Sequence, residues 1–179
     1  MITPENIKTI KRYCIHEAGH ALVSFNLRVP IKFVQINVKF NGNSLSIDGS
    51  TEREIEKMKE DLQSKDVSRV GRALSSHLSI FCGGMAAEAI CYPKERSLHG
   101  SENDLDRINE TLNLIKEQDE GKKQKLFQDA LELAKAIIRE NRTKLDKLAD
   151  KLFNLLVANK MSFKIEGSKV MDFLSEERR

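Results

Sequence analysis

The stretch YCIHEAGHALVSF, residues 13–25, places two histidines four residues apart, with a glutamate directly after the first, in a chain that has only four histidines. Apolar residues around it recur every three or four positions, which predicts a helix. Thr3 and Pro4 indicate where this helix begins, because threonine is a good helix cap and proline suits the first helical position. On such a helix His16 and His20 project from the same face, one turn apart.

This spacing is that of the H-E-x-x-H motif. Two imidazoles one turn apart can bind one metal ion, and zinc takes neutral imidazole readily. Glu17 points about a quarter turn away, where it can act on a water molecule instead of binding the ion. Ala18 and Gly19 are small and would let a neighbouring helix approach. A histidine on an apolar stretch is more often an ordinary core residue, but a chance match of this length is improbable in so short a chain. The sequence therefore predicts a zinc site with His16 and His20 as ligands.

A catalytic zinc site normally has a third protein ligand. The candidates are His77, which is typical of a half-buried helix position, and His99, which lies in a predicted loop. Glu88 interrupts the apolar run GGMAAEAI, and a carboxylate in a buried helix needs a partner, which favours a role in supporting a ligand. Asp104 follows Ser101 at the spacing of a helix-capping pattern. Spacing alone leaves the choice between these residues open.

The composition fits one globular domain, with 40% hydrophobic and 32% charged residues. The net charge is only +3, and basic residues alternate with acidic ones, so we expect no nucleic-acid partner. Cys14, Cys82 and Cys91 include no C-x-x-C pair and are expected to be reduced thiols. The N-terminus is polar and we find no long apolar run, so we expect a cytoplasmic chain without a signal peptide or a membrane span.

The rest of the pattern predicts a mainly helical fold with one small β hairpin or sheet. Pro30 ends the first helix, and alternating apolar residues then indicate a strand at 32–40. The NGN at 41–43 is typical of a hairpin turn, with SLSI at 44–47 as a short return strand.

The second half of the chain has mostly helical periodicity. The expected helices are 52–64, 66–91, 101–118, 122–140 and 142–159, with a loop at 92–100 and a helix break at 119–123. The last two helices are expected to form an antiparallel pair, and the tail 163–174 is expected to add a short strand or helix. We therefore predict one domain, 1–179, in which 1–120 holds the zinc site and 121–179 forms a C-terminal helical part.

Three sequence blocks resemble, in the same order, the zinc peptidase domain of the FtsH-type AAA protease family. They are HEAGHA at 16–21, GGMAAEAI at 83–90 and LHGSENDLDR at 98–107, and the C-terminal LLVANKMSFKIEGSKVMDFL also resembles the family's closing segment. The resemblance implies that His16, His20 and Asp104 bind zinc and that Glu17 is the catalytic base. It further implies that Glu88 supports a ligand from outside the metal's own shell.

The sequence also departs from the family pattern. Met85 stands where the family usually has arginine, Ala89 replaces the second glutamate of that block, and His99 replaces a threonine. The stretch that follows the third block is shorter than usual. No G-x-x-x-x-G-K-[ST] phosphate loop occurs in the printed sequence. We therefore expect neither the ATP-driven unfoldase nor the membrane anchor of the family here, while the hydrolytic chemistry is unaffected.

Together these features predict a zinc metalloendopeptidase that hydrolyses unfolded polypeptides without ATP. Zinc would lower the pKa of a bound water to about 7 and polarise the scissile carbonyl, and Glu17 would transfer the proton to the leaving amine. The strand VQINVKF at 34–40 would either bind an extended substrate at the sheet edge or simply cap the core. The alternative function is a non-catalytic zinc-binding interaction or regulatory module, against which Glu17 argues. The resemblance leaves room for an AAA ATPase acting in trans and for a homo-oligomer.

Overall fold

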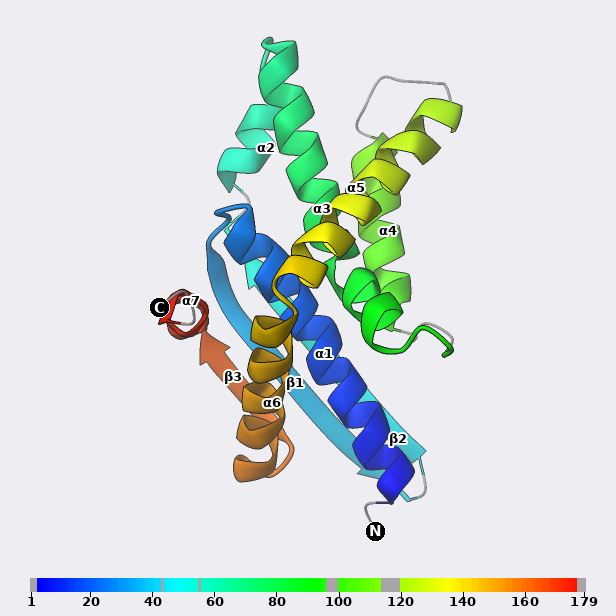
Figure 1. The fold of residues 1–179 in the computed structure, drawn as a ribbon, viewed down its shortest axis with the longest axis vertical. Helices are drawn as coiled ribbons and strands as arrows, with labels where there is room; N and C mark the ends of the chain where they lie inside the picture. The colour runs from blue at the N-terminus through cyan, green and yellow to red at the C-terminus, as the bar shows by residue number, and fades with distance from the viewer. Residues whose placement is uncertain (1–2, 43, 55, 96–99, 114–119, 177–179) are drawn as a thin grey trace.

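The computed structural model describes residues 3–42, 44–54, 56–95, 100–113 and 120–176. It is mainly helical with one small antiparallel sheet, so the predicted fold class is confirmed (Figure 1). The elements are α1 (Pro4–Asn26), β1 (Ile31–Asn41), β2 (Ser44–Arg53), α2 (Glu56–Leu62), α3 (Val67–Cys91), α4 (Gly100–Asn113), α5 (Glu120–Glu140), α6 (Arg142–Ala158), β3 (Ser162–Glu166) and α7 (Gly167–Glu176).

Helix α1 lies between the sheet and α3, and it carries the HEAGHA block into the middle of the molecule (Figure 1). Its start is as predicted: Pro4 opens it, and the Thr3 side chain accepts a hydrogen bond from the backbone N–H of Asn6. Gly19 and Gly83 let α1 and α3 touch, because a Cβ added at Gly83 would lie 2.9 Å from the Gly19 carbonyl oxygen. This close crossing brings α3 directly against the histidine motif.

The three strands have the order β2-β1-β3, so β1 is central and β2 is an edge strand. One prediction about the strands was wrong, and of the two roles left open for 34–40, binding a substrate at its own edge is excluded over most of its length. Strand β2 extends well beyond 44–47, because it pairs with β1 from Ser44 as far as Arg53. The stretch 34–40 offers no free edge over most of its length, since β3 from the C-terminal tail pairs with residues 33–37 on its other side.

The end of the chain supplies both a strand and a helix, β3 and α7, where one of the two was predicted. Helices α5 and α6 exist as predicted but do not pack as an antiparallel pair. Only Asn141 separates them, which is too short for a helical hairpin connection of two to five residues. Instead α5 packs mainly against α3, and α6 packs mainly against α1.

Three helix starts also differ from the predictions. Helix α2 begins at Glu56 rather than at Glu52, because β2 continues to Arg53. Helix α4 begins at Gly100, so Ser101 lies inside the helix rather than in front of it as a cap. Helix α5 begins at Glu120, so most of the predicted break at 119–123 is helical. Residues 114–119, where the end of the fourth predicted helix was placed, lie outside the described residues.

Helix α3 is the central helix that the sequence predicted. It is mostly buried from Ala73 onward, whereas Ser68, Arg69, Gly71 and Arg72 in its first turns are exposed. Its segment Ser68–Cys91 is long and apolar enough to cross a membrane by length and composition, although 67% of the critical window is buried inside the fold. The neighbours that cover it are mainly α1 and α5. Cys14, Cys82 and Cys91 are free thiols, and burial raises the pKa of the first two to about 12. They are therefore protonated packing residues.

Candidate metal centre

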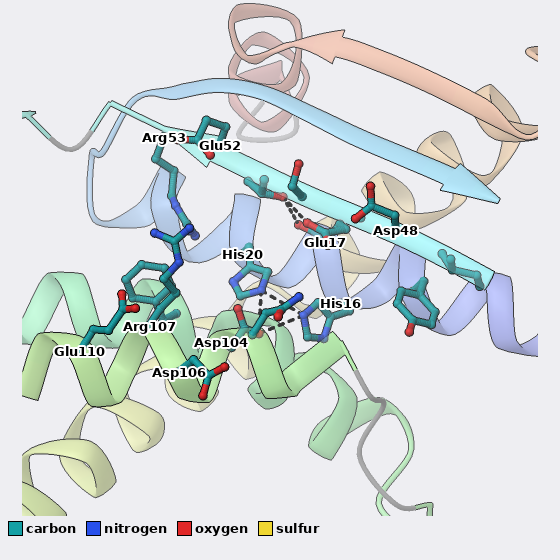
Figure 2. A pocket seen from close by; sticks show the side chains of 17 residues that line it. His16, Glu17, His20, Asp48, Glu52, Arg53, Asp104, Asp106, Arg107 and Glu110 are labelled. Atoms are coloured by element: carbon teal, nitrogen blue, oxygen red, sulfur yellow. Dashed lines mark hydrogen bonds and ion pairs between the residues drawn. The ribbon is translucent and has the colours of Figure 1, made fainter. Parts of the chain in front are cut away.

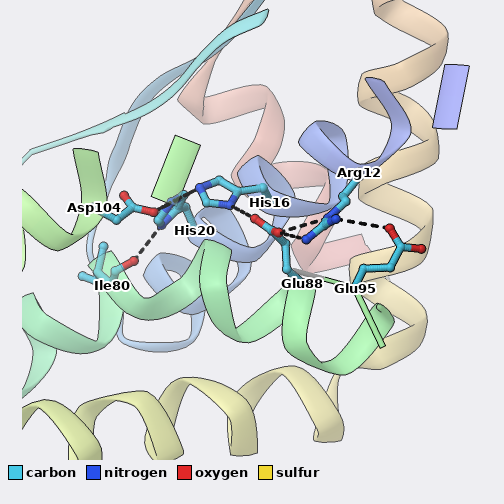
Figure 3. A network of polar contacts seen from close by, with 7 residues as sticks. All are labelled: Arg12, His16, His20, Ile80, Glu88, Glu95 and Asp104. Atoms are coloured by element: carbon cyan, nitrogen blue, oxygen red, sulfur yellow. Dashed lines mark hydrogen bonds and ion pairs between the residues drawn. The ribbon is translucent and has the colours of Figure 1, made fainter. Parts of the chain in front are cut away.

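Three buried side chains from two helices meet at one point: His16 and His20 of α1 and Asp104 of α4 (Figure 3). The two histidine Nε2 atoms are 3.1 Å apart. The Oδ2 atom of Asp104 lies 3.0 Å from Nε2 of His16 and 3.1 Å from Nε2 of His20. The structure thus brings together the three residues that the sequence proposed as ligands.

The other nitrogen of each ring is held by an oxygen that can only accept. Nδ1 of His16 lies 2.6 Å from Oε1 of Glu88, and Nδ1 of His20 lies 2.8 Å from the backbone carbonyl oxygen of Ile80. Each Nδ1 therefore donates a hydrogen, so in the neutral ring each Nε2 presents a lone pair. Two nitrogen lone pairs and a carboxylate oxygen then face one another. These three electron-rich atoms repel one another unless a proton or a cation lies between them. The cluster could therefore hold a metal ion.

The geometry fits a small divalent ion. Zinc bonds to histidine and carboxylate are about 2.0–2.2 Å, and tetrahedral angles then place ligand atoms about 3.3 Å apart. The three distances between Nε2, Nε2 and Oδ2 are 3.0–3.1 Å, within a few tenths of an ångström of that value. Two imidazoles with one carboxylate suit first-row divalent metals in general, so the donor set alone does not choose among them.

The same contacts shift the protonation of the metal-free cluster. Burial alone would lower the pKa of His16, but hydrogen bonds from its ring to Asp104 and Glu88 raise it to about 10. Burial alone would raise the pKa of Asp104, but the neighbouring His20 and His16 hold it well below its usual range. Without metal, the cluster is therefore held together as an imidazolium–carboxylate pair, and a metal ion has to displace that proton.

Glu88 joins the histidine motif to a buried arginine. Its Oε2 atom accepts hydrogen bonds from Nη2 and Nε of Arg12, at 2.7 and 3.0 Å, while its Oε1 atom faces His16 (Figure 3). Nη1 of Arg12 also donates to Glu95 at 3.2 Å. Glu88 therefore fixes the ring orientation of His16, as residues that support a metal-binding histidine do. Arg12 was missed in the sequence, although it lies four residues before His16 on the same helix face.

Helix α3 passes directly beneath the ring of His16. A Cβ added at Gly84 would collide with the Nε2, Cε1 and Cδ2 atoms of that ring. Glycine is therefore required at Gly84 for His16 to keep its place, just as Gly83 is required for the helix crossing. The paired glycines of the GGMAAEAI block thus have separate structural roles, one toward the neighbouring backbone and one toward a ligand.

Glu17 lies in the same cleft and is buried. Its Oε2 atom accepts a hydrogen bond from the Thr51 hydroxyl at 2.7 Å. Its Oε1 atom faces Gly49, where an added Cβ would lie 2.7 Å away. Strand β2 therefore fixes the glutamate through Thr51 and leaves room for it through Gly49. Both residues were missed, because the sequence DGSTER was interpreted as the segment following a short strand.

The cleft has a volume of about 520 Å³ and follows β2 (Figure 2). Seven consecutive residues, Ile47–Arg53, line it. Neighbouring residues of a strand point to opposite faces, so a lining by all seven means that the cleft runs along the strand's edge. On its opposite side the cleft is lined by α4, including Asp104 and Arg107. The outer edge of β2 therefore passes Glu17 and the cluster of His16, His20 and Asp104.

The other two candidate ligands lie elsewhere or outside the described residues. His77 is buried in α3, and its ring meets the ring of Phe81 edge-on with the centroids 4.8 Å apart. It does not belong to the His16, His20 and Asp104 cluster found among the described residues. His99 lies outside the described residues, so the structure gives no account of it.

No protein-family model matches the sequence, and no curated protein matches it. The arguments about function therefore rest on the site itself. In the structure, residues of the three sequence blocks come from α1, α3 and α4 and meet at the cluster: the histidines from the first, Glu88 and Gly84 from the second, and Asp104 from the third.

Proposed function

We propose that this chain is a zinc-dependent peptidase, related to the peptidase domain of FtsH-type AAA proteases, that hydrolyses unfolded polypeptides without ATP. One observation carries the proposal: a three-donor cluster and a buried glutamate share a cleft that runs along a free strand edge. His16, His20 and Asp104 would hold the ion. When bound, zinc supplies Lewis acidity, which polarises a substrate carbonyl and makes water a nucleophile near neutral pH.

Glu17 is the general base in this proposal. It is not part of the donor cluster, and its Oε2 atom is occupied by the Thr51 hydroxyl, which fixes the orientation of the carboxylate. A carboxylate held in this way can accept a proton from a water molecule in the cleft and deliver it to the departing amine.

Strand β2 is the surface on which the substrate would lie. Its outer edge has no strand partner among the described residues, and an extended peptide can add there as a further strand. Main-chain hydrogen bonds would carry most of this recognition, so many sequences could bind. A folded substrate exposes few such segments, and opening it costs about 5–15 kcal/mol. We therefore expect unfolded chains to be cleaved far faster than folded ones.

The alternative, a non-catalytic zinc-binding interaction or regulatory module, is less well supported by the site. Structural zinc sites normally have four protein ligands. The cluster has three within the described part of the chain, with Glu17 beside it in an open cleft. A structural site has no use for an additional buried carboxylate that does not bind the ion.

The test compares zinc-loaded wild type with Glu17→Gln on casein, an unstructured substrate. The variant should keep its zinc but lose cleavage by roughly 100-fold or more, because the proton acceptor is gone. Glu52→Gln is the matched control: this residue also lines the cleft but is exposed, and it should retain activity. Negligible cleavage by all three proteins, with or without an added AAA ATPase, would favour the interaction module instead.

A further inference from the structure

Among the described residues that line the cleft, Arg53, at the end of β2, is the one whose side chain holds a buried hydrogen-bond donor without a partner. Its Nη1 atom is buried and has no hydrogen-bond partner among the described residues. Its guanidinium group lies over the ring of Phe81, with Cζ 4.8 Å from the ring centre. Stacking of this kind covers the flat face of the group but leaves the N–H donors, which lie in its plane, free to bind.

The strand register directs Arg53 toward the reacting groups. Residues at every second position of a strand share a face, so Arg53 lies on the same face as Thr51 and Gly49, which both contact Glu17. Figure 2 shows the side chain reaching from β2 toward α4, beside His20. Burial lowers the pKa of Arg53, and the charges that oppose this most are those of Asp104 and Glu17. The guanidinium therefore lies near both the donor cluster and the base.

No carboxylate of the described residues forms an ion pair with Arg53. The adjacent Glu52 points to the opposite face of the strand, as the alternation requires and as Figure 2 shows. Across the cleft, Arg107 and Glu110 of α4 are both exposed, and the positive charge of Arg107 acts together with burial to lower the pKa of Arg53. Arg53, a half-buried residue that lines the cleft and has a buried free donor, thus has no counter-ion within the part of the chain that the structure describes.

We propose that Arg53 binds a carboxylate of the polypeptide substrate beside the metal centre, so that the cleft prefers acidic segments or chain ends. The inference rests on the proposed function, because it concerns the same cleft. A carboxylate is the best match for the guanidinium, whose planar fork can donate two parallel hydrogen bonds to its two oxygens. The partner would be either a Glu or Asp side chain or the terminal carboxylate of the chain.

Binding to an inactive protein tests this without relying on cleavage. The parent is zinc-loaded Glu17→Gln, and the probes are fluorescent peptides of about ten residues measured by anisotropy. One series carries a single Glu at successive positions with an amidated end, a second carries Gln at the same positions, and a third carries Gln with a free terminal carboxylate. We expect one Glu position, or the free terminus, to bind about 10-fold more tightly than its neutral counterpart. Tighter binding of a peptide with Glu at one position identifies a side-chain carboxylate as the partner of Arg53. Tighter binding of the peptide with a free terminus identifies the terminal carboxylate as the partner.

Variants then show whether Arg53 is responsible. Adding Arg53→Gln should bring the preference close to 1, and Arg53→Lys, which keeps the charge and the packing but not the fork, should retain part of it. Arg72→Gln removes an exposed arginine that does not line this cleft and should leave the preference unchanged. A preference that persists in Arg53→Gln and disappears with a chelator would place the carboxylate on the metal and overturn the proposal.

The remaining outcomes are also decisive. Equal binding of charged and neutral peptides by the parent would overturn the carboxylate site. A preference that depends on Arg53, found in a protein whose wild type cleaves nothing, would support the site while removing the peptidase function. The two proposals can therefore fail separately.

Discussion

The substitution Glu88→Gln tests most directly whether Glu88 supports the proposed metal centre through His16. The two side chains have nearly the same shape, and the Gln carbonyl can still accept the hydrogen from Nδ1 of His16. The amide group would then face Arg12, whose Nε and Nη2 atoms now donate to Glu88 at 3.0 and 2.7 Å. Donor would face donor in a buried place, and the negative charge next to His16 would be lost.

Two effects follow, and their sizes can be worked out separately. Losing the residue that orients a metal-binding histidine typically weakens metal affinity by about 10- to 100-fold. Breaking a buried ion pair on one side costs about 3–5 kcal/mol. We expect the lower end, about 3 kcal/mol, because Arg12 retains Glu95 at 3.2 Å. For a domain of this size that corresponds to a fall in melting temperature of about 6–12 °C.

Glu95→Gln is the matched control. Glu95 also binds Arg12, but it is exposed and pairs with Lys8 at 2.8 Å. Its carboxylate binds these two cations and not His16. It should change zinc affinity less than about 2-fold and leave the melting temperature nearly unchanged, because exposed ion pairs contribute little to stability. The assays are competitive titration of zinc against a chelator and thermal unfolding with the metal removed. Equal loss of zinc affinity in both variants would refute the idea that Glu88 acts on the metal through His16.

The remaining predictions concern pH and the position of Glu17. Metal ligands must be deprotonated, and His16 of the metal-free protein has a pKa of about 10, so zinc binding near pH 8 should release a proton. The affinity for zinc should therefore rise about 10-fold per pH unit between about pH 7 and 9. Calorimetry in buffers of different ionisation enthalpy measures the number of protons released. The same raised pKa means that charged His16 stabilises the metal-free fold fully below about pH 6.5 and that this stabilisation is lost as the pH rises through about 10. A metal-free protein that becomes more stable from pH 7 to 9.5 would contradict a raised pKa for His16. Gly49→Ala should displace Glu17 and reduce peptidase activity by about 100-fold while zinc content stays the same. Gly71→Ala, where an added Cβ meets nothing within 4 Å, should leave activity unchanged.

The predictions that agree with the structure rest on local signals. Thr3 and Pro4 define the start of α1 through contacts within a few residues, and the spacing of His16 and His20 has the same meaning on any helix. Glu88 could be singled out because a charge inside an apolar helix is costly unless it is paired, and in the structure it is paired. Each of these inferences needed only a short window of sequence.

The predictions that were wrong required contacts between distant segments. The sequence DGSTER at 48–53 has turn-like composition, yet it forms the second half of β2 because β1 pairs with it and Thr51 bonds to Glu17 of α1. For the same reason, neither Thr51 nor Arg53 could be recognised as a cleft residue beforehand. The packing partners of α5 and α6 also depend on segments far away in the sequence. Each helix has an apolar face, but its periodicity does not indicate which other helix packs on that face.

The C-terminal segment shows how a region outside the site can decide what the site accepts. Of the described residues after Glu110, 111–113 and 120–176, none lines the cleft. Yet β3 pairs with one side of β1, and Gly167 lets the start of α7 pack so closely on Ile31 that an added Cβ would collide with its carbonyl oxygen. With that side of β1 occupied by the tail and the other by β2, the sheet has two outer edges, those of β2 and β3, and the edge of β2 is the one that passes Glu17 and the donor cluster. If an extended substrate adds to this sheet, it can therefore add beside the reacting groups, and the tail closes the alternative edge of β1.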